Sequence, residues 1–451
     1  NKTQNLSFVF STGAYLDSLR LTGKVVDALT TQGKEGVWVM LYDELADSLP
    51  RKQRPYYLAK TNKEGEFSLE NIKADTFKIF ALLDKNSNYL FDQDGEEIGF
   101  YSQPFELTDS TRTQVQLSLF APKVAPKLLS ARFAHRGLIR VLYNQKIDSL
   151  RLVPLPPLTG DALAYTQTDA DSAYVWLRTE SLRPDSSYSF VVQPYGDTLR
   201  LTWSASLDTL PLPRILAPAS AAGGKSMNKN AAKPILPPLK QSPFEPMYLR
   251  VPTPLMRMDT ALLRCYRDTI FADSLQKRLP ALAVDSLPFR LRGEWSGGWL
   301  AGKYQLVFLP SALVDIYGRS NTDTLVQTVE LLKESDLGNL LITAKGLDTL
   351  KTQHYVLQLL RGKEEIVHER PFVSAGVDTA AFAFPRLVPA AYTARIIVDD
   401  NANGRWDTGD YDTKRQPERV LSSRPTTLRA DWDNELEINL LQSAGGKKMK
   451  K

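Results

Sequence analysis

The residues best suited to chemistry form an Asp/Asn-rich segment near the end of the chain, over 399–410. Oxygen-bearing side chains fall at positions 1, 3, 5, 9 and 12 of this segment, with Gly404 at position 6, which is the spacing of a calcium loop. Alternating Asp and Asn side chains in a tight turn can converge on one hard cation. The expected ligands are Asp399, Asn401, Asn403, Arg405 through its backbone carbonyl, Asp407 and Asp410.

Two departures distinguish this segment from an EF-hand. Asp410 stands where a bidentate Glu is usual, which predicts weaker affinity, and strands rather than helices are expected on both sides. An earlier segment repeats the pattern at Asp84, Asn86, Asn88 and Asp92. There Tyr89 replaces the glycine and Gly95 replaces the last ligand, although Asp94, Glu96 and Glu97 could substitute.

A second interpretation needs no metal. Asp and Asn side chains cap long hairpin loops by accepting hydrogen bonds from nearby backbone N–H groups. In either interpretation the role is structural, and calcium is the only cofactor that the sequence suggests.

Other reactive groups are sparse, and we expect a protein that is not an enzyme. His135, His354 and His368 are expected in separate units, as surface or strand residues, and the single Cys265 lies in a strand pattern. We find no nucleophile elbow and no Gly-rich phosphate loop. A glycosidase pair of carboxylates is the less favoured alternative.

Composition indicates a folded, multi-domain chain. Its 451 residues are enough for about three or four domains, and 43% hydrophobic content argues against wholesale disorder. The net charge of +5 is small for this length, so no nucleic-acid partner is expected. No apolar run approaches the roughly 18 residues of a membrane-spanning helix.

Short strand patterns separated by turn residues predict an all-β protein made of tandem β-sandwich domains. Residues 1–13 are expected to be the last strand of a truncated Ig-like domain, or else a strand that docks onto the next domain. The first case would place any lipid anchor upstream of this sequence. The other expected units are a β-domain at 14–122, Ig-like sandwiches at 123–212 and 247–333, a Pro/Ala/Gly-rich linker at 213–246, a second β-domain at 334–442, and a disordered basic tail at 443–451.

The strongest signal is an internal repeat between the two β-domains. Nine residues of the first match nine of the second at a constant offset of 315, from Phe67 and Phe382 to Asp92 and Asp407. Because the match preserves both the apolar pattern and the polar loop without a gap, we infer a duplication. The paired order would be sandwich and β-domain, then the same two units again.

Exposed aromatic residues are a further possible binding feature. Trp295, Trp299 and Tyr304 surround a Gly-Gly pair, and Tyr56 and Tyr57 follow a proline. Aromatic platforms bind sugars or partner proteins, whereas sandwich cores bury such residues. An exposed planar array would favour a carbohydrate-binding or adhesion protein.

The chain resembles a known family in its combination of segments. The stretch Phe8 to Gly13, followed by Leu21 to Ala28, is similar to the junction in Ig-like-domain surface lipoproteins of Bacteroidota. In that family an Ig-like domain of the S-layer type precedes a carboxypeptidase-regulatory-like, or prealbumin-like, β-domain. Segments that resemble the family's β-domains and later regions are 60–67, 77–82, 315–318, 403–409 and 414–418.

The resemblance implies a lipid-anchored protein on the outer face of the outer membrane. It implies a non-enzymatic subunit of an outer-membrane complex, such as outer membrane protein assembly or secretion machinery. The expected partners are outer-membrane β-barrel proteins and other surface lipoproteins. The membrane would be reached only through an N-terminal anchor that this sequence does not contain, and the family brings no catalytic residues.

Overall fold

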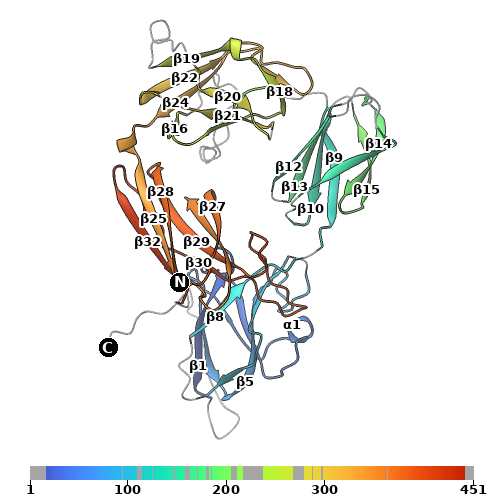
Figure 1. Cartoon of the computed structure of the whole chain (residues 1–451). Coiled ribbons are helices and arrows are strands. Elements are labelled where there is room, and N and C mark those ends of the chain that lie inside the picture. Colours follow the sequence, from blue (N-terminus) through green and yellow to red (C-terminus); the bar gives the residue numbers. More distant parts are fainter. Residues whose placement is uncertain are drawn as a thin grey trace, which may run out of the picture.

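The computed structural model consists almost entirely of β-sandwich domains (Figure 1). It describes residues 17–441 apart from 94, 109–113, 124, 146, 148, 158–162, 170, 179–181, 184, 205–210, 217–236, 268–278, 287, 296–297 and 363. The expected strand at 1–13 and tail at 443–451 therefore lie outside the described residues. In the described part, the sheets group into four sandwiches, domains 1 to 4, which confirms the all-β tandem prediction.

Domain 1 packs the sheet β4-β1-β8 against the sheet β3-β2-β5-β6, with β7 paired to β5. Alternate residues such as Val39 and Leu41 of β2 and Ile79 of β5 point into the core between the sheets, as the two-residue period of a strand requires. The elements are β1 (Leu19–Asp27), β2 (Trp38–Tyr42), α1 (Leu49–Lys52), β3 (Tyr57–Lys60), β4 (Glu66–Ile72), β5 (Asp75–Leu83), β6 (Glu97–Phe100), β7 (Phe105–Leu107) and β8 (Gln114–Leu119).

Domain 2 is an antiparallel sandwich of the sheets β12-β13-β10-β9 and β11-β14-β15. Its core contains Trp203, Tyr143 and Phe190, all fully buried. The strands are β9 (Leu128–His135), β10 (Leu138–Tyr143), β11 (Arg151–Leu155), β12 (Leu163–Asp169), β13 (Ser172–Arg178), β14 (Ser186–Gln193) and β15 (Thr198–Trp203).

Domain 3 takes up both described ends of the expected linker. Ile215 packs in its core, and β16 pairs in parallel with β24, so these parts of 213–246 belong to the sandwich. The sheets are β16-β24-β22-β19, β17-β21-β20 and β18-β23. The elements are β16 (Leu239–Gln241), β17 (Met247–Arg250), β18 (Leu255–Met258), η3 (Thr260–Leu262), β19 (Leu263–Arg267), β20 (Ala281–Val284), β21 (Arg290–Glu294), β22 (Gly302–Phe308), β23 (Leu313–Asp315) and β24 (Leu325–Leu331).

Domain 4 has the topology of domain 1. Its sheets are β28-β25-β32 and β27-β26-β29-β30, with β31 paired to β29. In both domains the first strand pairs in parallel with the last, and a register shift falls near its start, at Leu19/Leu21 and at Gly338/Leu340. The elements are η4 (Glu334–Asp336), β25 (Gly338–Lys345), β26 (His354–Arg361), β27 (Glu365–Val373), β28 (Thr379–Leu387), β29 (Ala391–Asp399), β30 (Val420–Ser422), β31 (Thr426–Thr427) and β32 (Asp433–Asn439). This correspondence supports the inferred duplication.

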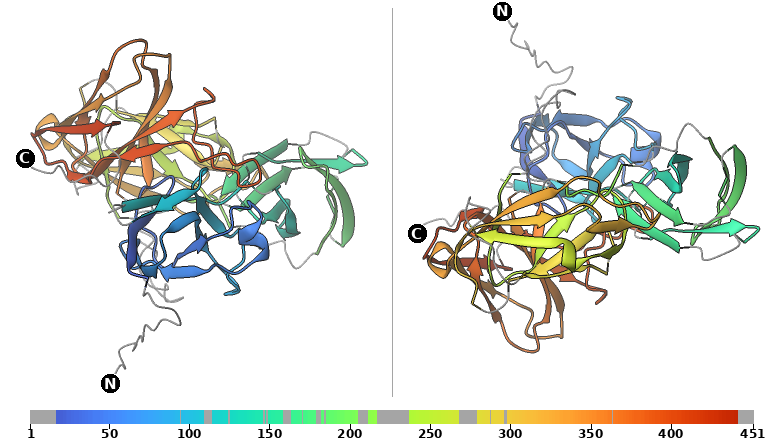
Figure 2. Two further views of the ribbon diagram at one scale, coloured as in Figure 1. Left: turned by 90° about the horizontal axis from the view of Figure 1, so that it is seen from below. Right: turned by 90° about the horizontal axis from the view of Figure 1, so that it is seen from above.

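The four domains close into a ring (Figures 1 and 2). Domains 2 and 3 meet at Trp176 and Phe289, whose ring centroids are 6.2 Å apart. Domains 3 and 4 meet where the Arg386 guanidinium lies 4.2 Å from the centre of the Phe244 ring. Domain 4 contacts domain 1, so the two copies of the repeated β-domain lie side by side.

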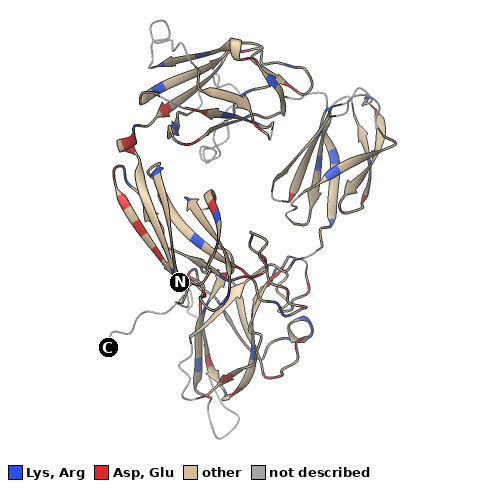
Figure 3. Ribbon diagram, in the orientation of Figure 1, with Lys and Arg blue, Asp and Glu red and all other residues tan. Residues whose placement is uncertain are grey.

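Charged residues of both signs occur on all four domains (Figure 3). This mixed pattern agrees with the small net charge. Among the described residues, the helices are too short and too polar to cross a membrane.

Candidate functional site

The Asp/Asn loop of domain 4 begins at the end of β29 and folds around its own carboxylates. The Asp399 side chain is buried and accepts hydrogen bonds from the backbone N–H groups of Asn403 and Gly404, at 3.1 and 2.8 Å. The side-chain amides of Asn401 and Asn403 both donate to the Asp407 carboxylate, at 2.6 and 2.5 Å. Five of the six expected ligand residues therefore form one compact loop.

The sixth expected residue, Asp410, caps a different turn. Its Oδ1 accepts the backbone N–H groups of Asp412 and Thr413, at 2.9 and 3.1 Å. The sequence spacing placed it at position 12 of one loop, but in the structure it opens the next loop.

The loop of domain 1 repeats most of this arrangement. Asp84 accepts the backbone N–H groups of Ser87 and Tyr89, at 2.7 and 2.8 Å. Asn86 and Asn88 donate to Asp92, at 3.1 and 2.7 Å. The left-handed residues also match at the offset of 315, because φ is +62° at Ser87 and +60° at Ala402, and +64° at Tyr89 and +76° at Gly404. Tyr89 thus adopts the conformation for which its counterpart uses glycine.

A glutamate behind each loop fixes both of its ends. Glu96 accepts the backbone N–H groups of Lys85 and Asp92, at 3.1 and 3.0 Å. Glu418 accepts those of Asp400 and Asp407, both at 2.9 Å, and burial raises the pKa of its carboxyl group. Lys85 and Asp400 differ by 315, as do Asp92 and Asp407, so the two glutamates are equivalent. Glu418 does not follow the offset of 315 from Glu96, because the loop before Glu418 is longer.

The geometry favours backbone capping with the side chains as they are placed. Among the described residues, no group of three His, Cys, Asp or Glu side chains is positioned to hold a metal ion. The amide nitrogens of Asn401 and Asn403 face Asp407, and a cation would require both amides to turn their oxygens inward. That rotation would break the hydrogen bonds that the two Oδ1 atoms accept from the backbone N–H groups of Asn403 and Arg405, so calcium would have to replace these bonds. Calcium binding stays a prediction.

The longer second loop makes the contact between the two repeated domains. Glu96 follows Asp92 by four positions and Glu418 follows Asp407 by eleven, a difference of seven. The added residues carry Tyr411, which is 3% exposed and lies among aromatic rings of domain 1. Its ring centroid lies 5.2 Å from that of Phe100, and its hydroxyl donates to the backbone carbonyl of Asp47.

Polar contacts surround the buried tyrosine. Thr408 donates to the backbone carbonyl of Ala121 at 2.7 Å, and Gln416 donates to that of Phe100 at 2.9 Å. Arg51 of α1 pairs with Asp412 at 3.0 Å. Gly409 lies so close to domain 1 that an added Cβ would come within 2.5 Å of the Phe120 ring. The insertion is therefore fitted to domain 1 along its whole length.

A turn of domain 1 makes the reciprocal contact with domain 4. Leu29, in the connection between β1 and β2, packs with Trp406 against Val356, Ile397 and Val420. The last three belong to the face of the β27-β26-β29-β30 sheet that points away from the domain core. The backbone carbonyl of Leu29 accepts a hydrogen bond from Arg395 at 3.4 Å, and burial lowers the pKa of this arginine.

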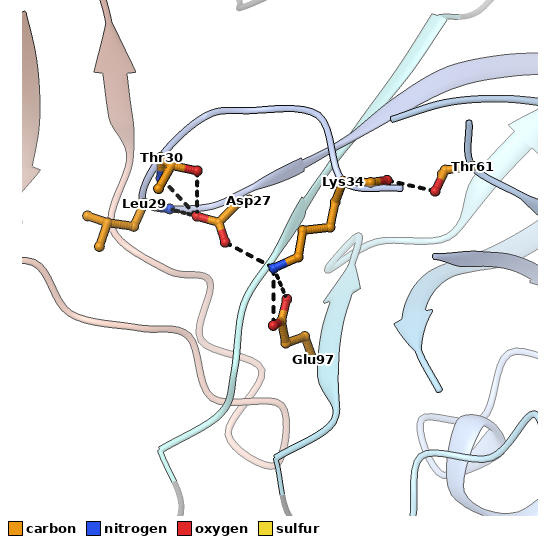
Figure 4. Close-up of polar contacts among 6 residues, drawn as sticks. All are labelled: Asp27, Leu29, Thr30, Lys34, Thr61 and Glu97. Atoms are coloured by element: carbon orange, nitrogen blue, oxygen red, sulfur yellow. Dashed lines mark hydrogen bonds and ion pairs between the residues drawn. The ribbon is translucent and has the colours of Figure 1, made fainter. Parts of the chain in front are cut away.

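Asp27 holds this turn in place (Figure 4). Its Oδ1 accepts the backbone N–H groups of Leu29 and Thr30, at 3.1 and 2.8 Å. Its Oδ2 lies 3.4 Å from Lys34 Nζ, which also pairs with Glu97 at 2.8 Å. Burial alone would lower the pKa of Lys34, but Glu97 and Asp27 outweigh that effect and raise it. The charged cluster thus fixes the turn that presents Leu29.

The remaining candidate residues have ordinary structural positions. Trp295 and Tyr304 are buried in the core of domain 3, with Trp299 packed against them, so the tryptophan cluster is not an exposed sugar platform. His354 and His368 lie in neighbouring strands β26 and β27, which corrects the expectation of separate units, although they are not opposite one another. Cys265 is buried in β19, and burial raises its pKa to about 12.

A polar cleft of about 1320 Å³ runs beside the contact between domains 1 and 4. Its walls are the outward face of the β4-β1-β8 sheet and the segment 416–421. Hydroxyl and amide side chains such as Thr22, Asn62 and Ser68 line it, together with charged side chains of both signs such as Lys24 and Glu66. Clefts between domains are frequent ligand sites, and these groups can exchange hydrogen bonds with a polyhydroxylated molecule.

Comparison with known proteins shows no matching family model and no matching curated protein. Among solved structures, the four N-terminal Ig domains of Dscam1 isoform 8.4 align over 92% of this chain and 97% of that one, with 10% identity and a TM-score of 0.17. The SGBP-B protein of the Bacteroides ovatus mixed-linkage glucan utilization locus, in complex with a mixed-linkage heptasaccharide, aligns over 95% of this chain and 96% of that one. Its identity is 11% and its TM-score 0.21. Because these scores are low, the fold assignment here rests on the strands and sheets of the chain itself.

Proposed function

We propose that this protein is a non-enzymatic interaction subunit of an outer-membrane complex, held on the outer surface of the membrane by a lipid anchor. The observation that carries the proposal is the reciprocal contact between domains 1 and 4. Tyr411 of domain 4 packs into domain 1, and Leu29 of domain 1 packs on domain 4. Each domain therefore contributes a side chain to the contact that closes the ring. A closed ring presents its surfaces to a partner in a fixed geometry.

Preorganisation gives such a ring a physical advantage in binding. A string of domains on flexible joints would lose orientational freedom whenever a partner bound several of them. Domains that already contact one another lose less orientational freedom on binding. The family resemblance supplies the location and the partner class of the proposal, namely β-barrel proteins and other surface lipoproteins.

The test is affinity purification of the full-length protein from native membranes in a mild detergent. We expect a β-barrel protein to co-purify in fixed stoichiometry. The ring-opened variant Tyr411→Ala with Leu29→Asp should recover less of it at equal expression. Recovery of the protein as a lone monomer would overturn the proposal.

Carbohydrate binding is a second candidate function, and the polar cleft favours it. The cleft replaces the tryptophan cluster as the place where a sugar would bind. Titration calorimetry with soluble polysaccharides tests this function, with Ser68→Trp as the variant that fills the cleft. Heat of binding that the Ser68→Trp variant leaves unchanged would exclude the cleft.

A further inference from the structure

A second cavity lies where domains 2, 3 and 4 approach one another, apart from the polar cleft. Its volume of about 500 Å³ is in the usual range of small-molecule sites. Domain 2 contributes part of β12, domain 3 contributes most of the wall, and domain 4 contributes Glu365 at the start of β27. Both β12 and β27 lie toward the centre of the ring (Figure 1). We call this cavity the three-domain pocket.

One wall of the three-domain pocket carries an exposed aromatic ring. Tyr248 lies on the outward face of β17 and is 41% exposed. The Arg290 guanidinium lies 4.3 Å from the centre of this ring, in a cation–π contact that restricts the orientation of the ring. Phe289 and Leu216 add apolar surface to the pocket. An exposed ring of fixed orientation can stack on the C–H groups of a sugar unit.

The charges around the pocket leave one arginine uncompensated. Glu365 accepts hydrogen bonds from Arg361 at 3.0 and 2.7 Å, and Arg290 forms an ion pair with Asp285. Arg250 also lines the pocket, and its guanidinium has no hydrogen-bond or ion-pair partner within the described part of the chain. Because guanidinium groups bind carboxylates through two parallel hydrogen bonds, Arg250 favours a ligand that carries a carboxylate.

Neutral hydrogen-bonding groups complete the pocket. Thr166, Gln167 and Thr168 of β12 bring hydroxyl and amide groups, which donate and accept hydrogen bonds. A uronic acid unit matches all three features of the pocket, since it combines one carboxylate with several hydroxyl groups and an apolar face of C–H groups. A glutamate side chain of a peptide brings the carboxylate but has neither hydroxyl groups nor a rigid apolar face.

We propose that the three-domain pocket binds an acidic oligosaccharide built of uronic acid units, with a carboxylate on Arg250 and a sugar face on Tyr248. The proposal goes beyond the interaction role, and it concerns a different place from the polar cleft. Residues of three domains line the pocket, so the arrangement of these domains in the ring is what assembles it.

The test is titration calorimetry of the full chain with a trimer of galacturonic acid at low ionic strength. We expect the trimer to bind, and its methyl ester, which lacks the negative charges, to bind roughly tenfold or more weakly. A glutamate trimer with blocked ends carries the same charge and separates sugar recognition from charge attraction alone. It should also bind roughly tenfold or more weakly than the sugar. No binding of the sugar trimer, or equal binding of the ester or the peptide, would overturn the proposal.

Substitutions locate the binding. Arg250→Gln should weaken binding of the sugar trimer roughly tenfold or more, and because Arg250 is exposed, Tm should not change. Arg257→Gln is the matched control, at an exposed arginine of domain 3 that does not line the pocket, and should bind like the unchanged protein.

A further variant separates this site from the polar cleft. Ser68→Trp, which fills the cleft, should leave binding of the trimer unchanged. Binding that survives Arg250→Gln, or that Ser68→Trp abolishes, would overturn the assignment to the three-domain pocket. Recovery of the protein from membranes as a lone monomer would overturn the interaction role without affecting this site.

Discussion

Replacing Tyr411 by alanine should open the ring while leaving the four domains folded. The side chain is 3% exposed, and its ring centroid lies 5.2, 5.8 and 6.0 Å from those of Phe100, Phe91 and Phe80. Truncating a buried aromatic residue costs about 3–5 kcal/mol, which corresponds to roughly a hundredfold or greater shift toward the open form. Tyr411→Phe keeps the ring and loses only the hydrogen bond to Asp47, at a cost of about 1 kcal/mol.

The contacts of Leu29 and the polar fringe remain in the single variant, so the full effect is expected when Leu29→Asp is added. The assay is the distance between spin labels placed at Lys63 in domain 1 and Lys351 in domain 4, both exposed, while the native Cys265 is buried. The unchanged protein should give one narrow distance distribution and the double variant a broad one. Tyr56→Ala, at a tyrosine that is 65% exposed, is the matched control and should resemble the unchanged protein. A narrow, unshifted distribution in the double variant would refute the idea that these two contacts close the ring.

The remaining predictions concern the insertion and the Asp/Asn loops. Gly409→Ala should weaken the same interface by about 1–3 kcal/mol, because the new Cβ would overlap the buried Phe120 ring. The distribution of distances between the spin labels should broaden. Thr413→Ala, at an exposed neighbouring position, should leave that distribution unchanged. If the calcium prediction is correct, calcium at a hundred times its Kd should stabilise the folded protein by about 2.7 kcal/mol and raise Tm. The double substitution of Asp399 and Asp407 by alanine should abolish this rise. A Tm that is the same with calcium and with chelator would leave backbone capping as the sole role of the loop. Burial raises the pKa of Asp407, but the amides of Asn401 and Asn403 outweigh burial and hold it below its ordinary 3.8. The stabilisation is therefore present above that pH and lost as pH falls through the lower value in the folded protein, and Asp407→Asn should flatten this part of a Tm-versus-pH curve; an equally steep acid limb in the variant would contradict the assignment.

Much of the fold could be predicted from the sequence because strand periodicity and turn residues are local signals. The duplication was also predictable, since Phe67 to Asp92 and Phe382 to Asp407 keep a gap-free offset. The equivalence of Glu96 and Glu418 cannot be recognised at this offset, because the insertion changes the offset between these two residues. Asp410 fitted the spacing of a calcium loop, yet it caps the following turn, since spacing alone does not reveal where one loop ends and the next begins.

The expected linker shows the same limit. Pro-rich composition over 213–246 indicated a tether, but Ile215 and β16 are parts of domain 3. A three-residue strand such as Leu239–Gln241 carries too little pattern to be recognised before its partner β24 is known. The tryptophan cluster was equally ambiguous, because aromatic residues serve cores and binding platforms alike.

By itself, the sequence determined that this is a tandem all-β chain with two related β-domains and paired Asp/Asn loops. These features follow from contacts between residues close in the chain, or from copying of one segment. Only the tertiary structure decided that the added residues of the second copy place Tyr411 inside the first copy, and that Leu29 of the first copy packs on the second. The physical reason is that burial of a side chain depends on which surface folding brings to it, and Tyr411 and Asp47 are 364 positions apart in the chain.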